Sequence, residues 1–181
     1  MPITADMQPV GSIAFLDGEA AADNGGELRV LQAESPVYQG DVLSTGPDAQ
    51  MEILFNDETR LMQGENSVIQ IDDYVFDLDD PGSSEAVFDM SQGTFRMVTG
   101  AIVDMGDKDI TVNTPLATIG IRGTVTLHQI FENMENHGVE SISVGNVVEI
   151  TDSQGNMHVV ELPQQIISVL RDFASNPPRT M

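Results

Sequence analysis

Apolar and polar residues alternate at every second position through most of this chain, and this pattern limits the chain to β-structure. Residues 110–113 and 117–121 show the alternation clearly, on either side of Pro115. Successive side chains of a strand point to opposite faces of a sheet, so the pattern is typical of half-buried strands. Helical spacing is almost absent, and turn residues recur at intervals of roughly eight to twelve residues. We therefore expect an all-β protein.

The predicted strands are short, and they favour a single domain of antiparallel strands and hairpins. Such a domain is either sandwich-like or short β-solenoid-like. Asn24 and Gly25 predict a tight hairpin turn. Residues 143–169 loosely repeat the opening residues 11–32, which is consistent with a quasi-repetitive sheet. We expect strands at residues 11–16, 27–33, 42–45, 51–55, 59–62, 67–76, 86–90, 94–98, 125–131 and 139–144.

The sequence does not decide the secondary structure of two segments. Residues 132–138 are interpreted as a hairpin loop, with one helical turn at 131–136 as the alternative, and residues 170–175 are interpreted as a short helix. A length of 181 residues suits one domain with a sizeable core. We assign residues 1–8 to a flexible arm, 9–170 to the folded domain and 171–181 to a linker or tail.

The charge of the chain is extreme and excludes two classes of partner. Its 29 acidic and 7 basic residues give a formal net charge of −22. Such a surface repels nucleic acid and anionic membranes, so neither is an expected partner. No cysteine is present, which excludes disulfides and thiolate metal sites. We see no signal peptide at the N-terminus and no apolar run long enough to span a membrane, so we expect no membrane insertion.

The residues that usually carry catalysis or bind metals form no recognisable pattern. His128, His137 and His158 are far apart in sequence and lack metal-ligand spacing, so we expect them on the surface or on strand faces. No G-x-S-x-G motif is present. We therefore nominate no catalytic, cofactor-binding or metal-binding residue, and we expect a protein that is not an enzyme.

The acidic loop at residues 77–82 was compared with the calcium loop of EF-hands. Asp77, Asp79 and Gly82 stand at suitable positions. Pro81 occupies a ligand position, however, and Phe88 stands where a bidentate glutamate is needed. A hairpin loop is the favoured interpretation, and weak calcium binding is the alternative.

One segment resembles a known family. VNTPLATIGIRGT, at residues 112–124, is similar to the T-P-x-A-x-x-G-I-R-G-T signature of FecR-type domains, which are bacterial cell-envelope modules. The resemblance extends through residues 39–46, 51–77 and 88–102, and it covers approximately residues 9–170. We expect the signature residues to be structural: Thr114, Pro115, Ala117, Gly120, Ile121, Arg122, Gly123 and Thr124. In so acidic a chain Arg122 should find a carboxylate or carbonyl partner, so we predict that it is at least partly buried and hydrogen-bonded.

The resemblance to FecR-type domains also implies a function. The pieces match the variant of the domain found near the N-terminus of large secreted, adhesin-like repeat proteins of Gram-negative bacteria. This implies a non-enzymatic module of a cell-envelope or secreted protein that acts in anchoring, assembly or protein contact. Its partner would be another protein or the rest of a larger chain, in an extracellular or cell-envelope location without a visible signal peptide. The sequence leaves the oligomeric state undecided.

Two other functions were considered. The resemblance also allows a periplasmic sensor of FecR type that controls a sigma factor, although we see neither the cytoplasmic segment nor the membrane helix which that role uses. A glycan-binding domain would need an aromatic platform, and the chain has no tryptophan and only Tyr38 and Tyr74 as tyrosines.

Overall fold

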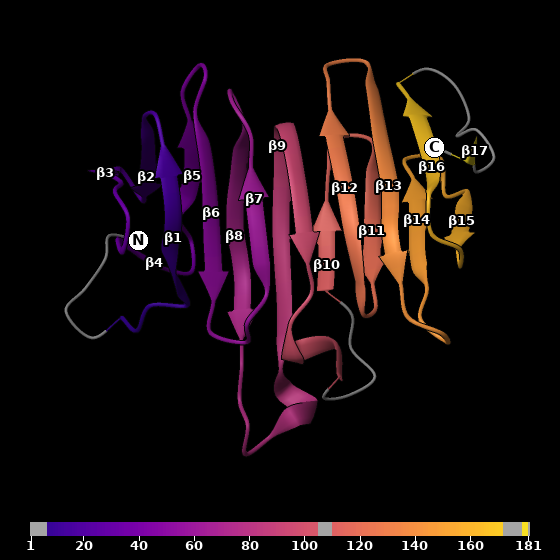
Figure 1. Ribbon diagram of the computed structural model, residues 1–181, viewed down its shortest axis with the longest axis horizontal. Helices are drawn as coiled ribbons and strands as arrows, with labels where there is room; N and C mark the ends of the chain where they lie inside the picture. Colours follow the sequence, from indigo (N-terminus) through magenta and orange to yellow (C-terminus); the bar gives the residue numbers. More distant parts are fainter. Residues whose placement is uncertain (1–6, 105–109, 172–178, 181) are drawn as a thin grey trace.

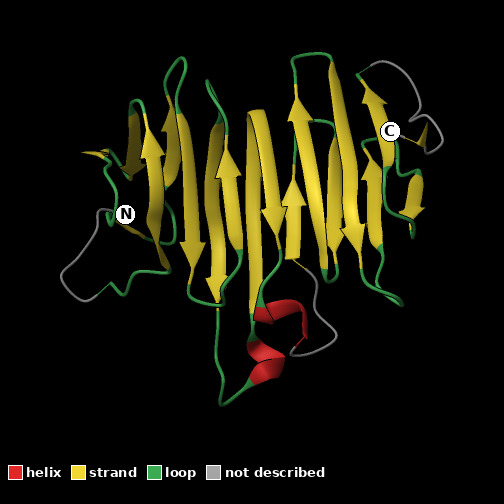
Figure 2. Cartoon of the chain, in the orientation of Figure 1, coloured by secondary structure: helices red, strands yellow, loops and turns green. Residues whose placement is uncertain are grey.

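The computed structural model describes residues 7–104, 110–171 and 179–180. The fold is nearly all β, with 59% of residues in strands and 4% in helices (Figure 2). Two short 3₁₀ turns, η1 (Pro81–Ser83) and η2 (Ala101–Asp104), are the helical elements of the described residues. The prediction of an all-β fold is confirmed.

The strands form two stacked layers, and neither layer closes into a barrel. Sheet A has the order β4–β1–β6–β7–β9–β12–β13–β16–β17, and sheet B the order β3–β2–β5–β8–β9–β10–β11–β14–β15. Figure 1 looks through both layers, with sheet A in front of sheet B. The bounds are β1 (Gly11–Asp17), β2 (Ala20–Asn24), β3 (Glu27–Val30), β4 (Pro36–Val37), β5 (Val42–Thr45), β6 (Gln50–Phe55), β7 (Arg60–Gln63), β8 (Val68–Val75), β9 (Glu85–Val98), β10 (Ile110–Asn113), β11 (Ala117–Ile121), β12 (Thr124–Ile130), β13 (Met134–Ile142), β14 (Val148–Asp152), β15 (Met157–Val160), β16 (Gln165–Leu170) and β17 (Arg179–Thr180).

A single hydrophobic core lies between the two sheets. Phe55 of sheet A packs against Phe88 of sheet B, with ring centroids 5.2 Å apart, and against Tyr74 at 5.4 Å. The alternation in the sequence accounts for this arrangement, because every second residue of strands such as β6, β10 and β11 reaches the core. Of the two architectures left open by the sequence, the sandwich-like one is observed.

Strand β9 belongs to both sheets and corrects two expectations. Its first half pairs with β8 and with β10 in sheet B, and its second half pairs with β7 and β12 in sheet A. Residues 86–90 and 94–98, predicted as two strands, are therefore one. The pairing of β9 with β10 is parallel, not antiparallel as expected. The crossing point is Gly93, whose positive φ of 108° suits glycine and where a Cβ would lie 2.0 Å from Ser67 Oγ.

Related hairpins occupy the two ends of sheet B. Hairpin β2–β3 turns at Gly25 as predicted, and hairpin β14–β15 ends the sheet on the opposite side (Figure 1). The loose sequence repeat thus corresponds to two similar edge hairpins.

The open segments are resolved in part. Strand β13 begins at Met134, so the loop after β12 is shorter than predicted and residues 134–136 are strand, not helix. Leu170 ends β16, and residues 172–175 of the expected helix lie outside the described residues, as does most of the expected N-terminal arm. Residues 179–180, assigned to the tail, pair with β16 as β17.

Candidate functional site

The first half of the signature forms the turn between β10 and β11 in sheet B. The backbone N–H of Thr114 donates to the carbonyl of Ala117 at 2.8 Å, and the N–H of Ala117 donates back to Thr114 Oγ1 at 3.0 Å. Pro115 lacks a donor and has a restricted φ, which suits a turn whose other polar groups are already paired. Thr114 thus closes its own turn.

This turn is held against sheet A by one buried carboxylate. Glu135 of β13 has no exposed surface. It accepts the hydroxyl of Thr114 at 2.5 Å and the backbone N–H of Leu116 at 3.0 Å. Hydrogen bonds to an ionised acceptor are stronger than neutral ones, so Glu135 fixes the turn to the opposite layer.

A chain of buried hydrogen bonds continues from this carboxylate along the inner face of sheet A. His137 Nε2 lies 3.2 Å from Glu135 Oε2, His137 Nδ1 lies 3.1 Å from His128 Nδ1, and His128 Nε2 lies 2.9 Å from Thr126 Oγ1. A carboxylate at Glu135 fixes the direction of every proton in this chain. Thr126 then donates to His128, His128 donates to His137, and His137 donates to Glu135.

The pKa of His128 agrees with this arrangement. Complete burial, reinforced by the neighbouring His137, lowers the pKa of His128 well below its ordinary value of 6.5. Two histidines expected to lie apart on surfaces or strand faces are therefore buried neighbours. Hairpin β12–β13 pairs His128 directly with His137. The hairpin loop predicted at residues 132–138 was the sequence signal from which this pairing could have been inferred.

The residues of this buried chain are hydrogen-bonded to one another. Each member is used by its neighbours, and all but Thr114 are buried. Among residues 7–104, 110–171 and 179–180, no group of three or more acidic, histidine or cysteine side chains could hold a metal ion. The geometry is that of a structural link between sheets.

The second half of the signature forms the turn between β11 and β12. Ile121 is fully buried and pairs with Ile110 and Val148, which anchors the turn in sheet B. Gly123 has a φ of 57°, and a Cβ there would lie 2.0 Å from Asn146 Nδ2. Asn146 donates to the Gly123 carbonyl at 2.9 Å, so this close approach requires glycine.

Arg122 differs from its prediction in its burial, whereas it does take part in hydrogen bonding. Its side chain is exposed, and its backbone N–H donates to the Val147 carbonyl at 3.2 Å. The expectation of burial was wrong because the flanking residues carry the turn: Ile121 fills the core, and Gly123 makes the close approach.

A polar cleft of about 320 Å³ lies beside this turn. Hydroxyl and amide groups dominate its walls, which come from Thr99, Gly100, Gly123, Thr124, Ser141 and Asn146. Thr124 is already bonded to the Ser141 carbonyl, and Thr99 Oγ1 lies within 3.3 Å of the Thr124 carbonyl. Its hydrogen-bonding groups are thus largely used by the protein itself.

Two further buried carboxylates in the resembling segments also serve the fold. Asp41 accepts from Arg29 at 2.5 Å, from Asn24 at 2.9 Å and from the N–H of Tyr38 at 2.9 Å. Together with Glu135, Asp41 shows that the buried acids of this domain hold loops.

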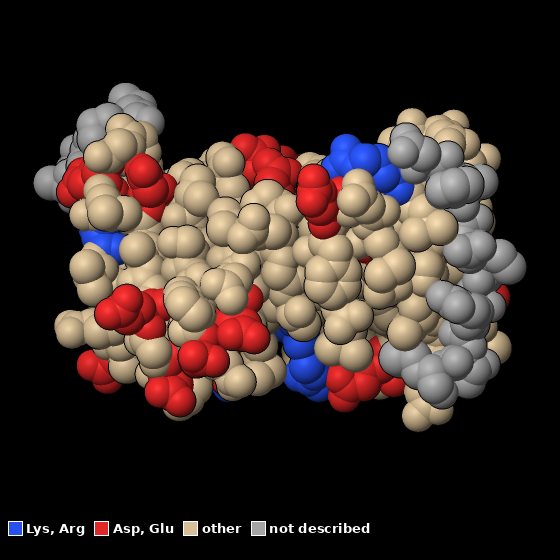
Figure 3. Space-filling model, turned by 90° about the horizontal axis from the view of Figure 1, so that it is seen from above, with Lys and Arg blue, Asp and Glu red and all other residues tan. Residues whose placement is uncertain are grey.

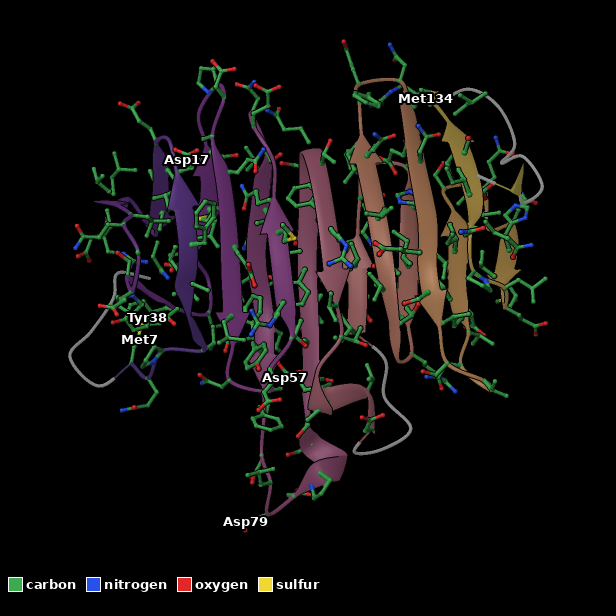
Figure 4. The ribbon with its side chains drawn as sticks, viewed as in Figure 1. Met7, Asp17, Tyr38, Asp57, Asp79 and Met134 are labelled. Carbon is green, nitrogen blue, oxygen red and sulfur yellow. The ribbon has the colours of Figure 1, made fainter. Side chains whose placement is uncertain are left out.

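Asp57 is the centre of the other cluster, at the lower end of the sandwich (Figure 4). It accepts from the Thr59 hydroxyl at 2.7 Å and from the Tyr74 hydroxyl at 2.8 Å. Burial, with the nearby Asp57 carboxylate, raises the pKa of Tyr74 far above its ordinary value. Tyr74 therefore stays protonated as a donor, and the cluster locks the turn after β6.

The acidic loop forms the tip below the sheets, where Figure 4 labels Asp79. The Asp77 carboxylate accepts the N–H groups of Asp79 at 2.8 Å and Asp80 at 3.2 Å. These contacts close the loop on itself, as in an ordinary Asx turn.

Comparison with protein families decides the membership of this chain. The profile described as FecR protein matches residues 41–148, more than half of the sequence and including the whole signature. The chain belongs to the FecR family. A comparison with curated proteins finds no match.

The FecR chain also has structural relatives. Its fold is similar to two crystal structures of a candidate anti-sigma factor from Parabacteroides distasonis, with TM-scores of 0.59 and 0.60 and sequence identities of 14% and 15%. Each comparison covers 77% of this chain and 59% of that one. The chain therefore corresponds to less than two thirds of that protein, and the likeness is one of fold. No helix in the described part of this FecR chain is long and apolar enough to cross a membrane.

Proposed function

We propose that this chain is a non-enzymatic FecR-type regulator that acts through protein contacts and controls a sigma factor. The observation that carries the proposal is the FecR match over residues 41–148, and the likeness to the candidate anti-sigma factor supports it. This was the alternative function in the sequence analysis, and the comparisons favour it over the adhesin-like one.

The use of polar groups supports a binding role over a catalytic one. Asp41, Asp57 and Glu135 are buried in hydrogen bonds that hold loops and turns. By contrast, large apolar side chains are exposed on both sheets, including Phe15 and Met62 on sheet A and Leu28 and Met157 on sheet B. Phe15 and Met62 line the same hollow, and an exposed apolar patch of this kind favours contact with other proteins.

Deleting the gene in the source organism and measuring the transcriptome tests the proposal. We expect the genes of one sigma factor to change expression, and reintroducing the chain within its natural full-length protein should restore them. An unchanged transcriptome would contradict the regulatory role. The Arg122→Ala variant adds a finer test, because Arg122 is an exposed signature residue. Loss of regulation with an unchanged melting temperature would assign this residue to a partner contact.

The second candidate is an N-terminal module of a large secreted, adhesin-like protein. It is favoured by the net charge of −22 and by the order of the four sequence motifs. In that case the deletion strain should lose surface attachment while its transcription stays unchanged. Cell fractionation with an antibody to the domain would test the proposed extracellular or cell-envelope location in either case.

A further inference from the structure

A β-bulge in β1 turns a large aromatic side chain away from the core. Ile13 pairs with Ile53 and faces inward, but the register shifts at Ala14, so Phe15 lies opposite Glu52 on the outer face of sheet A. Without the extra residue, Phe15 would point into the core. Instead 51% of its surface is exposed. Bulges change the direction of side chains and often occur at functional sites. The exposed ring of Phe15 is therefore a candidate for a binding contact.

The exposed ring borders an apolar groove. Phe15, Met62 and Leu127 line a hollow of about 160 Å³ across strands β1, β6, β7, β9 and β12. Met62 is also 43% exposed. The same face therefore carries a protruding aromatic ring and, next to it, a hollow with apolar walls.

The charges around the groove are balanced, unlike those of the chain as a whole. Arg60 pairs with Glu52 at 2.7 Å, and Arg96 pairs with Glu140 at 2.7 Å and 3.1 Å. The outer face of sheet B, by contrast, carries Asp23, Asp89 and Glu149 in its strands. Seen from above, acidic side chains lie along both long borders of the molecule and basic side chains are few (Figure 3).

We propose that this outer face of sheet A is the interface of a homodimer, in which Phe15 of each copy enters the groove of the other. A two-fold interface uses the same patch on both subunits and so needs a patch that carries both a projection and a hollow. Two chains of charge −22 repel each other, and this charge-balanced apolar face is where they can approach at least cost. The paired arginines and glutamates would form a polar rim around the apolar centre. The proposal does not depend on the regulatory role.

Sedimentation velocity of the 181-residue chain over a range of concentrations tests this interface. We expect a reversible dimer with a dissociation constant on the order of 10 µM, as for a modest interface. Phe15→Ser and Met62→Gln should each raise that constant at least about tenfold, because both remove an apolar anchor. Leu28→Ser is the matched control: Leu28 is 71% exposed on edge strand β3 of sheet B, and its loss should leave the dimer unchanged.

Salt and cross-linking give independent readouts. Sodium chloride should strengthen the dimer by screening the repulsion between like-charged chains, whereas it would weaken docking of a basic partner. The chain has no cysteine, so Met62→Cys with a short bismaleimide should cross-link into dimers, and Leu28→Cys should not.

Three results would overturn the proposal. The first is a monomer at every concentration, and the second is a dimer that survives Phe15→Ser and Met62→Gln with unchanged affinity. The third is a monomeric chain that binds a different protein through this face. In that case Phe15→Ser would abolish binding of that protein, and the face would be assigned to it. Unchanged circular dichroism and melting temperatures of the variants would confirm that only the surface has changed.

Discussion

Glu135 on β13 accepts the backbone N–H of Leu116 from the opposite sheet, at 3.0 Å and with no exposed surface on the carboxylate residue. This contact joins the most recognisable turn of the FecR signature to a residue outside the signature. The hydroxyl of Thr114, in the same turn, donates to the same carboxylate. The signature is thus one side of a contact between the two sheets.

Glu135→Gln should destabilise the protein by about 1–3 kcal/mol, because buried donors lose a charged acceptor and the new amide N–H₂ faces groups that also donate. Urea denaturation followed by circular dichroism measures the change. Glu132→Gln, an exposed acid in the loop of the same hairpin, is the control and should leave the midpoint unchanged. Equal stability of the two variants would show that the link between sheets is energetically unimportant.

The lowered pKa of His128 predicts a loss of stability in acid. Below about pH 6.5, the ordinary pKa of histidine, His128 becomes protonated in the unfolded chain but stays neutral in the folded one. The unfolded state then binds more protons, so the free energy of unfolding falls as the pH falls. Between pH 7.5 and 5.5 this histidine alone should cost on the order of 1 kcal/mol. Denaturation curves at several pH values should show that His128→Gln flattens the slope. His158→Gln on β15 should keep it, and an equal slope in both variants would argue against the assignment.

Gly100→Ala should be among the most damaging small substitutions. A Cβ there would lie 2.1 Å from the Asp57 carbonyl oxygen and 2.3 Å from the Thr59 nitrogen, both backbone atoms of the locked turn. We expect a loss of about 3 kcal/mol, in the upper part of the range for overpacking. Gly82→Ala has only Asp80 within 4 Å, at 3.8 Å, and should change the melting temperature little. Thermal melts that rank the two variants the other way would contradict the predicted strain.

Salt should stabilise the fold, and calcium should add nothing specific. Self-repulsion in a chain of charge −22 opposes folding, and its reach falls to about 8 Å at physiological ionic strength. Melting temperatures should therefore rise with sodium chloride. At equal ionic strength, calcium should act like magnesium, because Asp77 already accepts N–H groups of its own loop. A gain of a few kcal/mol with calcium alone would reveal a real site.

The all-β fold and the residues of the core were predictable from the sequence, because both follow from the local alternation of apolar and polar residues. Alternation assigns Ile110, Val112, Ile119 and Ile121 to one face, and all four are fully buried. Asn24 and Gly25 predict a hairpin turn because few residues accept a positive φ, and in the structure Gly25 and Gly26 adopt it. The family signature is equally local, and it was recognised without any knowledge of pairing.

Long-range pairing was decided only by the tertiary structure. No local pattern tells that β9 crosses from one sheet to the other, or that β10 lies parallel to it. His128 and His137 look like isolated polar residues until the β12–β13 register sets them 3.1 Å apart, and Glu135 becomes a buried link only when the second sheet covers it. Arg122 was expected to be at least partly buried, but its position in the turn between β11 and β12 leaves it exposed. The physical reason is that the cost of burying a polar group depends on which neighbours satisfy it, and folding brings those neighbours from distant parts of the chain.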